Sequence, residues 1–441
     1  MSSVPYLESR MRDILETQAN ELARQSGFIV RQRAFSGADF AQGLVFGWWN
    51  KPRGRLVQLA RALGRRDVQI SASGLSQRFT PQAASFMEQL LEQTVSQVVS
   101  GPAVPLELLQ RFSSVVLEDS SVIALPDELK THWKGCGGGG SQSEAGVKLH
   151  VRLDLLHGRL QGPMLSDGRQ ADQRSPLRHE GIAPGGLSIT DEGYFGLRWL
   201  KEATKEGNRF FLTRPRYTTA FFDRAGQRLR LTDIGPKAVH QSLDLAVVVG
   251  QKVRLEARLI MVRVPEEVAK QRRESMWQTA RRHSTTPTQE QLALAQWTIL
   301  ITNAGPELLS VSDILILQRA RWQIERLFRL WKEDGAIDEW RSSNPWRILC
   351  ELYAKLIAMV IEHWVLIEQC WHDPYRSLVK AAAVIRDHAL SFIDVLLGEM
   401  SLLRLMQRLA RELRSGCQVD RRSKDPSLAQ LLSEGLPWPL T

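Results

Sequence analysis

Cysteine is scarce in this sequence of 441 residues, and its spacing excludes two kinds of site. The four cysteines, Cys136, Cys350, Cys370 and Cys417, are far apart, form no CxxC pair and have no histidine at the spacing of a zinc site. This pattern argues against a disulfide framework and against a structural zinc site. We therefore expect a reduced, cytoplasmic protein.

Long apolar runs are also missing. The first residues, MSSVPYLESRMRD, contain no apolar core of a signal peptide, and the most apolar segment, residues 356–367, is short and includes Glu362 and His363. A transmembrane helix needs about 20 mostly apolar residues. The sequence therefore predicts neither a signal peptide nor a membrane span.

Acidic residues are the minority among the charged ones. Lysine and arginine number 58 against 48 aspartates and glutamates, for a formal net charge of +10. This excess favours a polyanionic partner over an acidic small molecule. The hydrophobic content of 43% is that of a globular protein, and the length suits roughly two to four domains.

The first hundred residues have the apolar spacing of helices. Apolar side chains recur every three or four positions in residues 8–25, 38–49, 54–63 and 81–99. Between the last two segments lie the basic residues Arg65, Arg66 and Arg78 and several serines that suit helix caps. A helix-turn-helix-like DNA-binding module and a plain helical bundle both fit this pattern.

The apolar period changes to two from residue 113, which indicates strands in residues 113–126, 147–162 and 185–190. A second strand-rich run covers residues 208–265, followed by a basic helix at 266–283 and a long helix at 312–332. We predict an α/β (α+β) protein with this division: helical DNA-binding domain 1–100, core 101–207, β-rich insertion 208–290, core continued 291–345, and helical carboxy-terminal domain 346–441 with a possible role in dimerisation.

A glycine-rich stretch, GCGGGGSQSEAG, lies between the first two predicted strands at residues 135–146. Glycine-rich loops can bind phosphate, but no Gly-Lys-Ser/Thr follows this one and no helix begins after it. We therefore predict a flexible turn.

The long helix at 312–332 separates into two faces. Its core-facing stripe contains Leu317, Ala320, Ile324, Leu327, Phe328 and Trp331. A neighbouring sector of roughly 60° contains Gln318, Arg321, Glu325 and Lys332, so one carboxylate lies among cations beside the buried face. Arg321 and Glu325 taken alone also fit an ordinary surface ion pair.

Two further acids lie on or after predicted strands. Asp119 continues the alternation of Val115 and Leu117, and Asp191 ends the apolar strand LSIT. Either residue alone fits a turn or cap. Together with Glu325 they would supply carboxylates from three elements, which is what a pair of hard divalent cations needs.

With these residues in view, the chain resembles the insertion sequence 4 family of bacterial cut-and-paste transposases. The family signature is Tyr, two residues, Arg, three residues, Glu, six residues, Lys, and it falls here on Gln318, Arg321, Glu325 and Lys332. The blocks VVLEDSSVIALP and LSITDEGYFGLRWLKEATKEGNRFFLTRPR are also similar to the family, with Asp119 in the first and Asp191 in the second.

The resemblance implies a ribonuclease H-like catalytic core interrupted by a β-rich insertion, and a DDE transposase that uses Asp119, Asp191 and Glu325 as catalytic metal ligands. It implies Mg²⁺ or Mn²⁺, double-stranded DNA partners (terminal inverted repeats and target DNA) and a homodimer that pairs two ends. Some relatives form a hairpin intermediate aided by a tryptophan, whose place Trp297 would take. Arg214, in the second block, is a further expected DNA contact.

The departure from the family is Gln318 in place of the usual tyrosine, because glutamine can bind a phosphate but cannot stack on a base. Two other functions remain open: a related ribonuclease H-like nuclease or resolvase, and a DNA-binding remnant without catalysis. The basic stripe Arg404, Arg408 and Arg411 fits either phosphate contacts or a solvated helix face.

Overall fold

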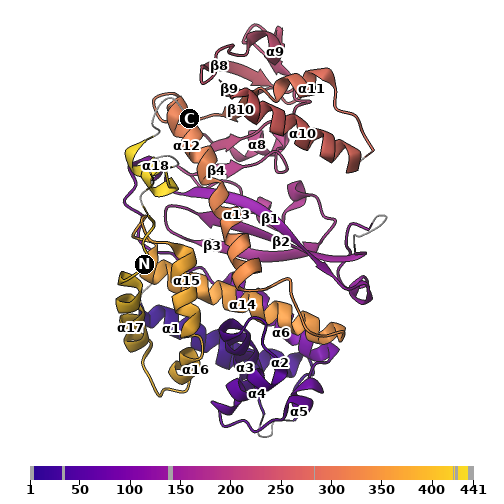
Figure 1. The fold of residues 1–441 in the computed structure, drawn as a ribbon, viewed down its shortest axis with the longest axis vertical. Helices are drawn as coiled ribbons and strands as arrows, with labels where there is room; N and C mark the ends of the chain where they lie inside the picture. The colour runs from indigo at the N-terminus through magenta and orange to yellow at the C-terminus, as the bar shows by residue number, and fades with distance from the viewer. Residues whose placement is uncertain are drawn as a thin grey trace.

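A single mixed sheet extends through the upper part of the protein in Figure 1. The computed structural model describes residues 4–31, 35–137, 143–282, 284–420, 422 and 426–435. Within these residues the sheet has ten strands in the order β3-β2-β1-β4-β5-β10-β9-β8-β6-β7.

The first five strands form the core half of the sheet. They are β1 (Val115–Leu125), β2 (Ala145–Asp154), β3 (Leu160–Asp167), β4 (Leu187–Thr190) and β5 (Phe210–Thr213). β1, β2 and β3 are antiparallel, whereas β4 is parallel to β1 and β5 is parallel to β4. This is the ribonuclease H-like arrangement, and it confirms the predicted fold class.

One predicted strand is wrong in detail. The segment expected as a single strand at residues 147–162 is two strands, β2 and β3, joined by a turn. The turn is hidden in the sequence because its leucines are apolar. It is fixed by the buried Asp154, whose carboxylate accepts the backbone N–H groups of Val115 and Leu156, and by Gly158 at φ +72°.

The other five strands form the insertion half of the sheet. They are β6 (Phe221–Phe222), β7 (Arg228–Leu229), β8 (Ser242–Val249), β9 (Leu255–Arg263) and β10 (Trp297–Thr302), and β10 joins the halves by pairing with both β5 and β9. Helices α9 (Leu231–Ile234), α10 (Glu266–Arg282) and α11 (Gln289–Leu294) accompany them. We group β5, from the range predicted as insertion, with the core half because it pairs with β4, and β10, from the range predicted as continued core, with the insertion half because it pairs along its whole length with β9.

The amino-terminal region is helical, as predicted. It comprises α1 (Val4–Arg12), a π-helical turn (Asp13–Gln18), α2 (Ala19–Gln25), α3 (Gly37–Asn50), α4 (Leu56–Gly64), α5 (Ala72–Ser76), α6 (Pro81–Ser96) and α7 (Glu107–Gln110). Arg65 and Arg66 form ion pairs with Asp394 and Asp39, and Arg78 lies over the ring of Phe35. The two ion-paired cations are therefore partly neutralised within the protein.

The carboxy-terminal region comprises α14 (Pro345–Cys370), α15 (Leu378–Asp387), α16 (Ser391–Leu396), α17 (Leu402–Arg414) and α18 (Leu428–Glu434). α14 is buried on all sides and packs against α3, α6 and α15, so the two helical ends of the chain share one apolar core (Figure 1). A helix that is apolar all round must be covered in this way. None of the described helices has the length and apolarity to cross a membrane.

The glycine-rich stretch lies in the connection between β1 and β2 and extends into the start of β2. Residues 138–142 of this predicted turn lie outside the described residues. Its two ends meet, because the Gly135 N–H donates to the Glu144 carbonyl over 2.6 Å.

Candidate active site

The helix that carries Glu325 packs on β1 (Figure 1). It consists of α12 (Val311–Ala320), α13 (Trp322–Arg329) and a π-helical turn (Leu330–Asp334), and it begins with a capping box between Ser310 and Asp313. The predicted core stripe is confirmed, since all six of its residues are buried. Burial of this stripe leaves Glu325 on the flank of the helix, with 32% of its side chain exposed.

Asp119 and Asp191 are brought together by parallel pairing. Leu117 of β1 lies opposite Ile189 of β4, so two residues further along each chain Asp119 comes level with Asp191. Asp119 also keeps the alternation of β1, on the face of the buried Leu117 and Ile123. The structure therefore places both aspartates at the same edge of two adjacent strands.

Arg321 connects Glu325 to this edge. Its Nη2 lies 2.6 Å from a Glu325 carboxylate oxygen, and its Nη1 lies 3.9 Å from Asp119 Oδ2. Burial raises the pKa of Asp119 to about 7, and the charges of Asp191 and Glu325 also raise it, against the Ser120 N–H and Arg321, which lower it. Asp119 is thus close enough to both other acids for their charges to raise its pKa.

The donor set fits divalent cations in its chemistry. Hard cations prefer carboxylate oxygens from several elements, and a cation would relieve the repulsion that raises the pKa of Asp119. Among the described residues, however, no three acids, histidines or cysteines are close enough to hold a metal as they stand. Arg321 lies between the acids, and Asp191 Oδ1 already accepts the N–H groups of Gly193 and Tyr194.

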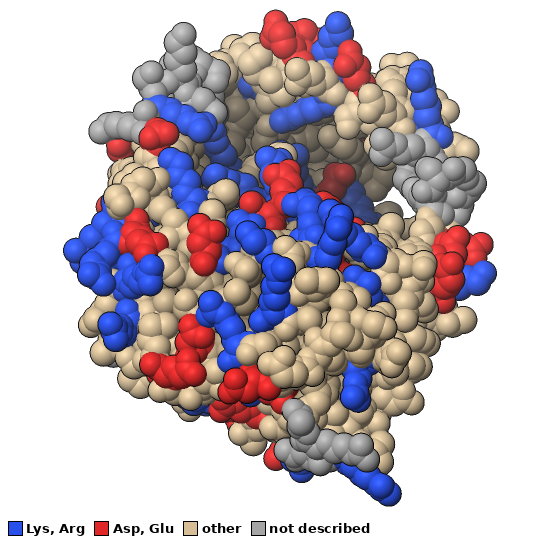
Figure 2. Space-filling model, turned by 60° about the horizontal axis from the view of Figure 1, so that its bottom comes forward, with Lys and Arg blue, Asp and Glu red and all other residues tan. Residues whose placement is uncertain are grey.

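A cleft of about 660 Å³ opens beside the acids between the two halves of the sheet. Its lining includes Asp191, Arg214, Tyr217, Arg272 and Arg321. Figure 2 shows a hollow in the surface, with acidic and basic side chains inside it and many lysines and arginines around it. Arg214 is reachable by water, yet the surrounding protein desolvates it and lowers its pKa, and the charge of Arg321 adds to this. Such a cleft is built to receive negative charge.

The other predicted DNA contacts differ in their exposure and in their hydrogen bonds. Gln318 is 7% exposed, and its Oε1 has no hydrogen-bond partner, so its side chain does not face solvent. Lys332 lies in the π-helical turn and donates to the Val122 carbonyl over 3.2 Å, at the edge of β1. Trp297 lines the cleft but is 7% exposed, and its indole N–H donates to the Pro236 carbonyl.

Two features were not predicted from the sequence. Trp322, the residue after Arg321, is 54% exposed, with the Arg321 guanidinium 5.7 Å from its ring centre. Asp172 accepts hydrogen bonds from Ser120 Oγ and Lys148 Nζ, which ties the loop after β3 to the residue following Asp119. The position of Trp322 beside Arg321 is a signal that the sequence does contain, whereas the Asp172 contacts depend on long-range folding.

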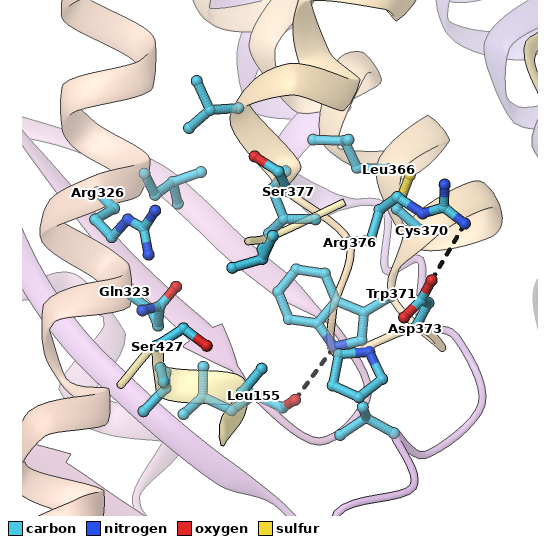
Figure 3. A pocket seen from close by; sticks show the side chains of 18 of the residues that line it. Leu155, Gln323, Arg326, Leu366, Cys370, Trp371, Asp373, Arg376, Ser377 and Ser427 are labelled. Carbon is cyan, nitrogen blue, oxygen red and sulfur yellow. Dashed lines mark hydrogen bonds and ion pairs between the residues drawn. The ribbon is translucent and has the colours of Figure 1, made fainter. Parts of the chain in front are cut away.

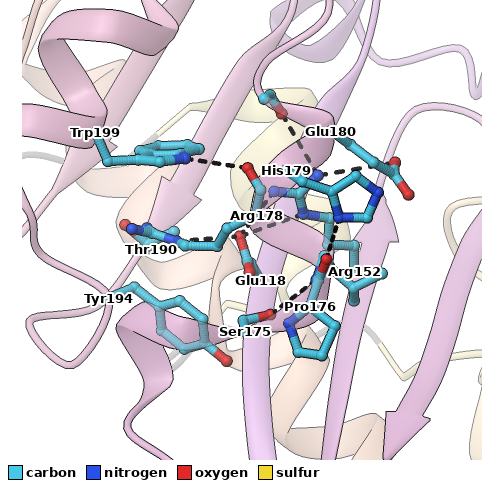
Figure 4. Close-up of polar contacts among 12 residues, drawn as sticks. Glu118, Arg152, Ser175, Pro176, Arg178, His179, Glu180, Thr190, Tyr194 and Trp199 are labelled. Carbon is cyan, nitrogen blue, oxygen red and sulfur yellow. Dashed lines mark hydrogen bonds and ion pairs between the residues drawn. The ribbon is translucent and has the colours of Figure 1, made fainter.

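A buried ionic cluster lies behind Asp119, on the opposite face of β1 (Figure 4). Glu118 is 1% exposed and accepts two hydrogen bonds of 3.2 Å from Arg152, its partner on β2. Arg178, 3.9 Å from the same carboxylate oxygen, stacks on Trp199 with 4.0 Å between guanidinium carbon and ring centre. The cluster therefore joins the strand of Asp119 to the helix that follows Asp191.

Comparison with known proteins agrees with this fold. The match to the family described as transposase DDE domain covers residues 110–361, which is more than half of the chain. The chain belongs to this family. It is therefore a DNA transposase, an enzyme that cleaves DNA and transfers strands, and it depends on a divalent metal.

The curated relatives are transposases of bacterial insertion sequences. The transposase for insertion sequence element IS231F of Bacillus thuringiensis subsp. israelensis is 24% identical over 92% of this chain and 90% of its own length. That of IS231C from Bacillus thuringiensis subsp. berliner is 26% identical over 87% and 85%. That of IS1151 from Clostridium perfringens is 24% identical over 82% and 80%. The likeness therefore extends well beyond the DDE domain.

Proposed function

We propose that Asp119, Asp191 and Glu325 are the catalytic acids of this transposase and hold two Mg²⁺ or Mn²⁺ ions. The observation that carries the proposal is the position of Arg321, within 3.9 Å of Asp119 and 2.6 Å of Glu325, beside an edge where Asp119 and Asp191 lie level. Two strands and one helix thus direct carboxylates to one place. Two divalent ions there would polarise the phosphodiester and activate the attacking water or 3′ hydroxyl.

The chain's own residues then position the DNA. When the acids take up metal, Arg321 no longer has to neutralise them and can turn to the scissile phosphate. Arg214, which also lines the cleft, supplies a second cation, and Lys332 supplies a third from the edge of β1. Gln318 lies one helical turn before Arg321 on the same side of the helix.

The DNA substrates we propose are the terminal inverted repeats of the protein's own insertion sequence and a target duplex. Two copies of the chain would pair two ends as a homodimer. A hairpin pathway would require Trp297 to leave its buried position, because its indole N–H is hydrogen-bonded to Pro236.

The proposal is tested with end DNA, Mg²⁺ and three single variants: Asp119→Ala, Asp191→Ala and Glu325→Ala. Each should abolish 3′ nicking and joining while leaving binding of the end largely intact, because each removes a metal ligand but no recognition surface. Asp172→Ala is the matched control, a carboxylate nearby that is already held by Ser120 and Lys148. Near-normal cleavage by one of the three variants would remove that residue from the site.

The two other functions predict different products. A nuclease or resolvase would cut the end DNA without transferring the 3′ strand to a target. A DNA-binding remnant would bind the ends and cut nothing at any Mg²⁺ or Mn²⁺ concentration.

A further inference from the structure

A second groove, of about 610 Å³, lies next to the active-site cleft. One wall is the start of α8 (Leu197–Ala203), and the others are residues 216–220 and 250–253. Its lining combines apolar side chains, among them Phe195, Leu197 and Trp199, with small or polar groups: Gly196 and Gly250, the hydroxyl groups of Thr218 and Thr219, and the amide of Gln251. Groups of this kind suit a ligand that is approached closely and hydrogen-bonded.

The exposed charge in this groove is positive. Arg198 and Arg216 both line it and both are exposed. In the part of the chain that the structure describes, neither arginine has a carboxylate within the 4.0 Å of an ion pair. The neighbouring surface adds Lys201 and Lys252, with Glu202 as the acid beside them.

Arg178 also lines the groove, and its polar contacts are drawn in Figure 4. It is 7% exposed, and its Nε and Nη2 have no hydrogen-bond partner, although Glu118 lies 3.9 Å from Nε. Its Nη1 approaches Gly196, where an added Cβ would lie 3.9 Å away. A buried cation with unused donors beside two exposed arginines makes a strong site for an anion.

The groove and the active-site cleft are separated by one stretch of chain. Arg214, Pro215 and Tyr217 line the cleft, whereas Arg216 and residues 218–220 line the groove. The loop after β4 also separates the two, because Asp191 and Glu192 line the cleft and residues 195–196 line the groove. A polymer that has one phosphate at the acids could therefore place its next phosphates in the groove.

We propose that this groove binds the phosphate backbone of the DNA that flanks the insertion sequence, beyond the scissile phosphate. Figure 1 shows α8 on one side of α13 and the amino-terminal helices, predicted to form a DNA-binding domain, on the other. A strand that runs from the repeat through the active site would continue toward α8. This inference rests on the proposed function of the cleft and adds a second, phosphate-binding site to it.

The test compares the binding of two DNA duplexes. One duplex ends at the terminus of the element, and the other continues past this terminus with a flank of about 10 nucleotides. This length is within the range that known binding sites for a single strand cover, about 4 to 16 nucleotides. Binding of each to the wild type and to the double variant Arg198→Ala/Arg216→Ala is measured over a series of salt concentrations. With the flanked duplex, affinity should fall about tenfold and the slope of log K against log salt should fall by about 2, as for two lost phosphate contacts. The unflanked duplex should bind the variant and the wild type equally.

Two further variants serve as an independent test of the groove and as a control. Gln251→Glu keeps the shape of the side chain but adds negative charge to the groove, and it should selectively weaken binding of the flanked duplex. Lys130→Ala/Lys380→Ala removes two exposed cations that lie outside the groove and should have no selective effect.

Several outcomes would overturn the inference. Equal weakening with both duplexes would mean that the groove binds the element end, and no weakening with either would mean that it binds no DNA. Loss of target joining with flanked binding unchanged would assign the groove to target DNA instead. If the wild type binds both duplexes but cleaves neither, the proposed function fails while the binding comparison still tests the groove.

Discussion

The two halves of the sheet are built differently. In the core half, β2 is ten residues long and buried along its whole length, and β1 pairs with it over ten positions. In the insertion half, β9 and β10 are mostly buried, but β6 and β7 have two residues each, and the first half of β8 alternates between exposed and half-buried positions. The acids of the candidate site come from the core half and from the helix packed on it, whereas Arg272 comes from the insertion.

This difference indicates which half of the sheet suits metal ligands and which suits cations that bind DNA. Metal ligands must be held to a fraction of an ångström, which suits strands and helices whose faces are buried. Cations that attract a DNA backbone need exposure more than precision, which suits a half-exposed sheet and its loops. The boundary between the halves, at β4, β5 and the segments after them, is where both requirements meet.

The largest effect on stability is expected from Glu118→Gln in the core half. Glu118 is the carboxylate nearest to both Arg152 and Arg178, so among the described residues its loss leaves Arg178 without an ion-pair partner and Arg152 with only Glu180, 3.9 Å away. Breaking a buried ionic cluster typically costs about 3 to 5 kcal/mol. We expect this loss of unfolding free energy in denaturant titration.

The matched change in the insertion half is Asp244→Asn. Asp244 pairs with Arg258 over 2.6 Å, but 32% of its side chain is exposed. A half-exposed pair contributes at most about 1 kcal/mol. Equal losses for Asp244→Asn and Glu118→Gln would contradict the contrast between the two halves.

Arg321→Ala should damage chemistry more than binding. Its guanidinium lies among the acids, where negative charge develops on the phosphate during cleavage, and loss of one such donor costs about 2 to 4 kcal/mol in the transition state. Single-turnover cleavage of bound end DNA should therefore slow by about 30- to 1000-fold. Arg272→Ala on the insertion wall should slow it less, because Arg272 is held by the Trp297 carbonyl and Thr298 Oγ1.

The control for this comparison is Arg329→Ala on the same helix. Arg329 is 68% exposed and lies 3.9 Å from Glu333, so its loss should change neither cleavage nor end binding. If Arg272→Ala slowed cleavage as much as Arg321→Ala, the insertion would contribute to the chemistry and the comparison would need revision.

Asp119→Asn tests the electrostatic cost of the candidate site without metal. An acid whose pKa is raised to about 7 in the folded state holds its proton more tightly there than in the unfolded chain. The contribution of the protonated Asp119 to the free energy of unfolding is fully present below about pH 4, and it is lost as the pH rises through 7. At pH 8 the variant should therefore be more stable than the wild type, by at most about 4 kcal/mol, with no gain at pH 4.

Asp127→Asn is the control of opposite sign. The pKa of Asp127 is lowered by the hydrogen bond from Ser143 and by the Glu144 N–H. Its ionised form is thus favoured by folding, so the substitution should not stabilise the protein at pH 8. Both variants are measured by thermal unfolding at pH 4 and pH 8 with a chelator present. A stability difference between Asp119→Asn and the wild type that is the same at both pH values would contradict the expectation.

The sequence predicted local features of the site better than long-range ones. The stripe of the Glu325 helix and the alternation that brings Asp119 to the face of Leu117 follow from helical and strand periods, and both are present in the structure. The approach of Arg321 to Asp119 depends on how a helix packs on a strand some two hundred residues away in the chain, which no local period encodes. Lys332 was placed by an ideal helical rise, whereas a π-helical turn changes that rise at residue 330.

The smallest effect is expected at Gln318, at the boundary between the buried helix face and the cleft. Gln318→Ala removes a buried amide whose oxygen has no partner, so we expect little change in stability and a modest loss of strand joining. Gln318→Tyr restores the residue usual in the family but adds volume at a site that is 7% exposed, which typically costs about 1 to 3 kcal/mol. Per folded molecule, joining should be unchanged or improved, because the ring offers a face for a base one turn before Arg321.

Joining by the two Gln318 variants is best measured on pre-cleaved ends, and unfolding free energy on the same preparations, so that stability and chemistry are separated. Gln323→Tyr, on the same helix but lining an apolar cavity on its other side (Figure 3), is the matched control for added volume. It adds the same side chain on the cavity side of the helix and should leave joining unchanged. If Gln318→Tyr abolished joining while folding and end binding persisted, the family signature would be misaligned on this helix, and Arg321 and Lys332 would lose their proposed roles with it.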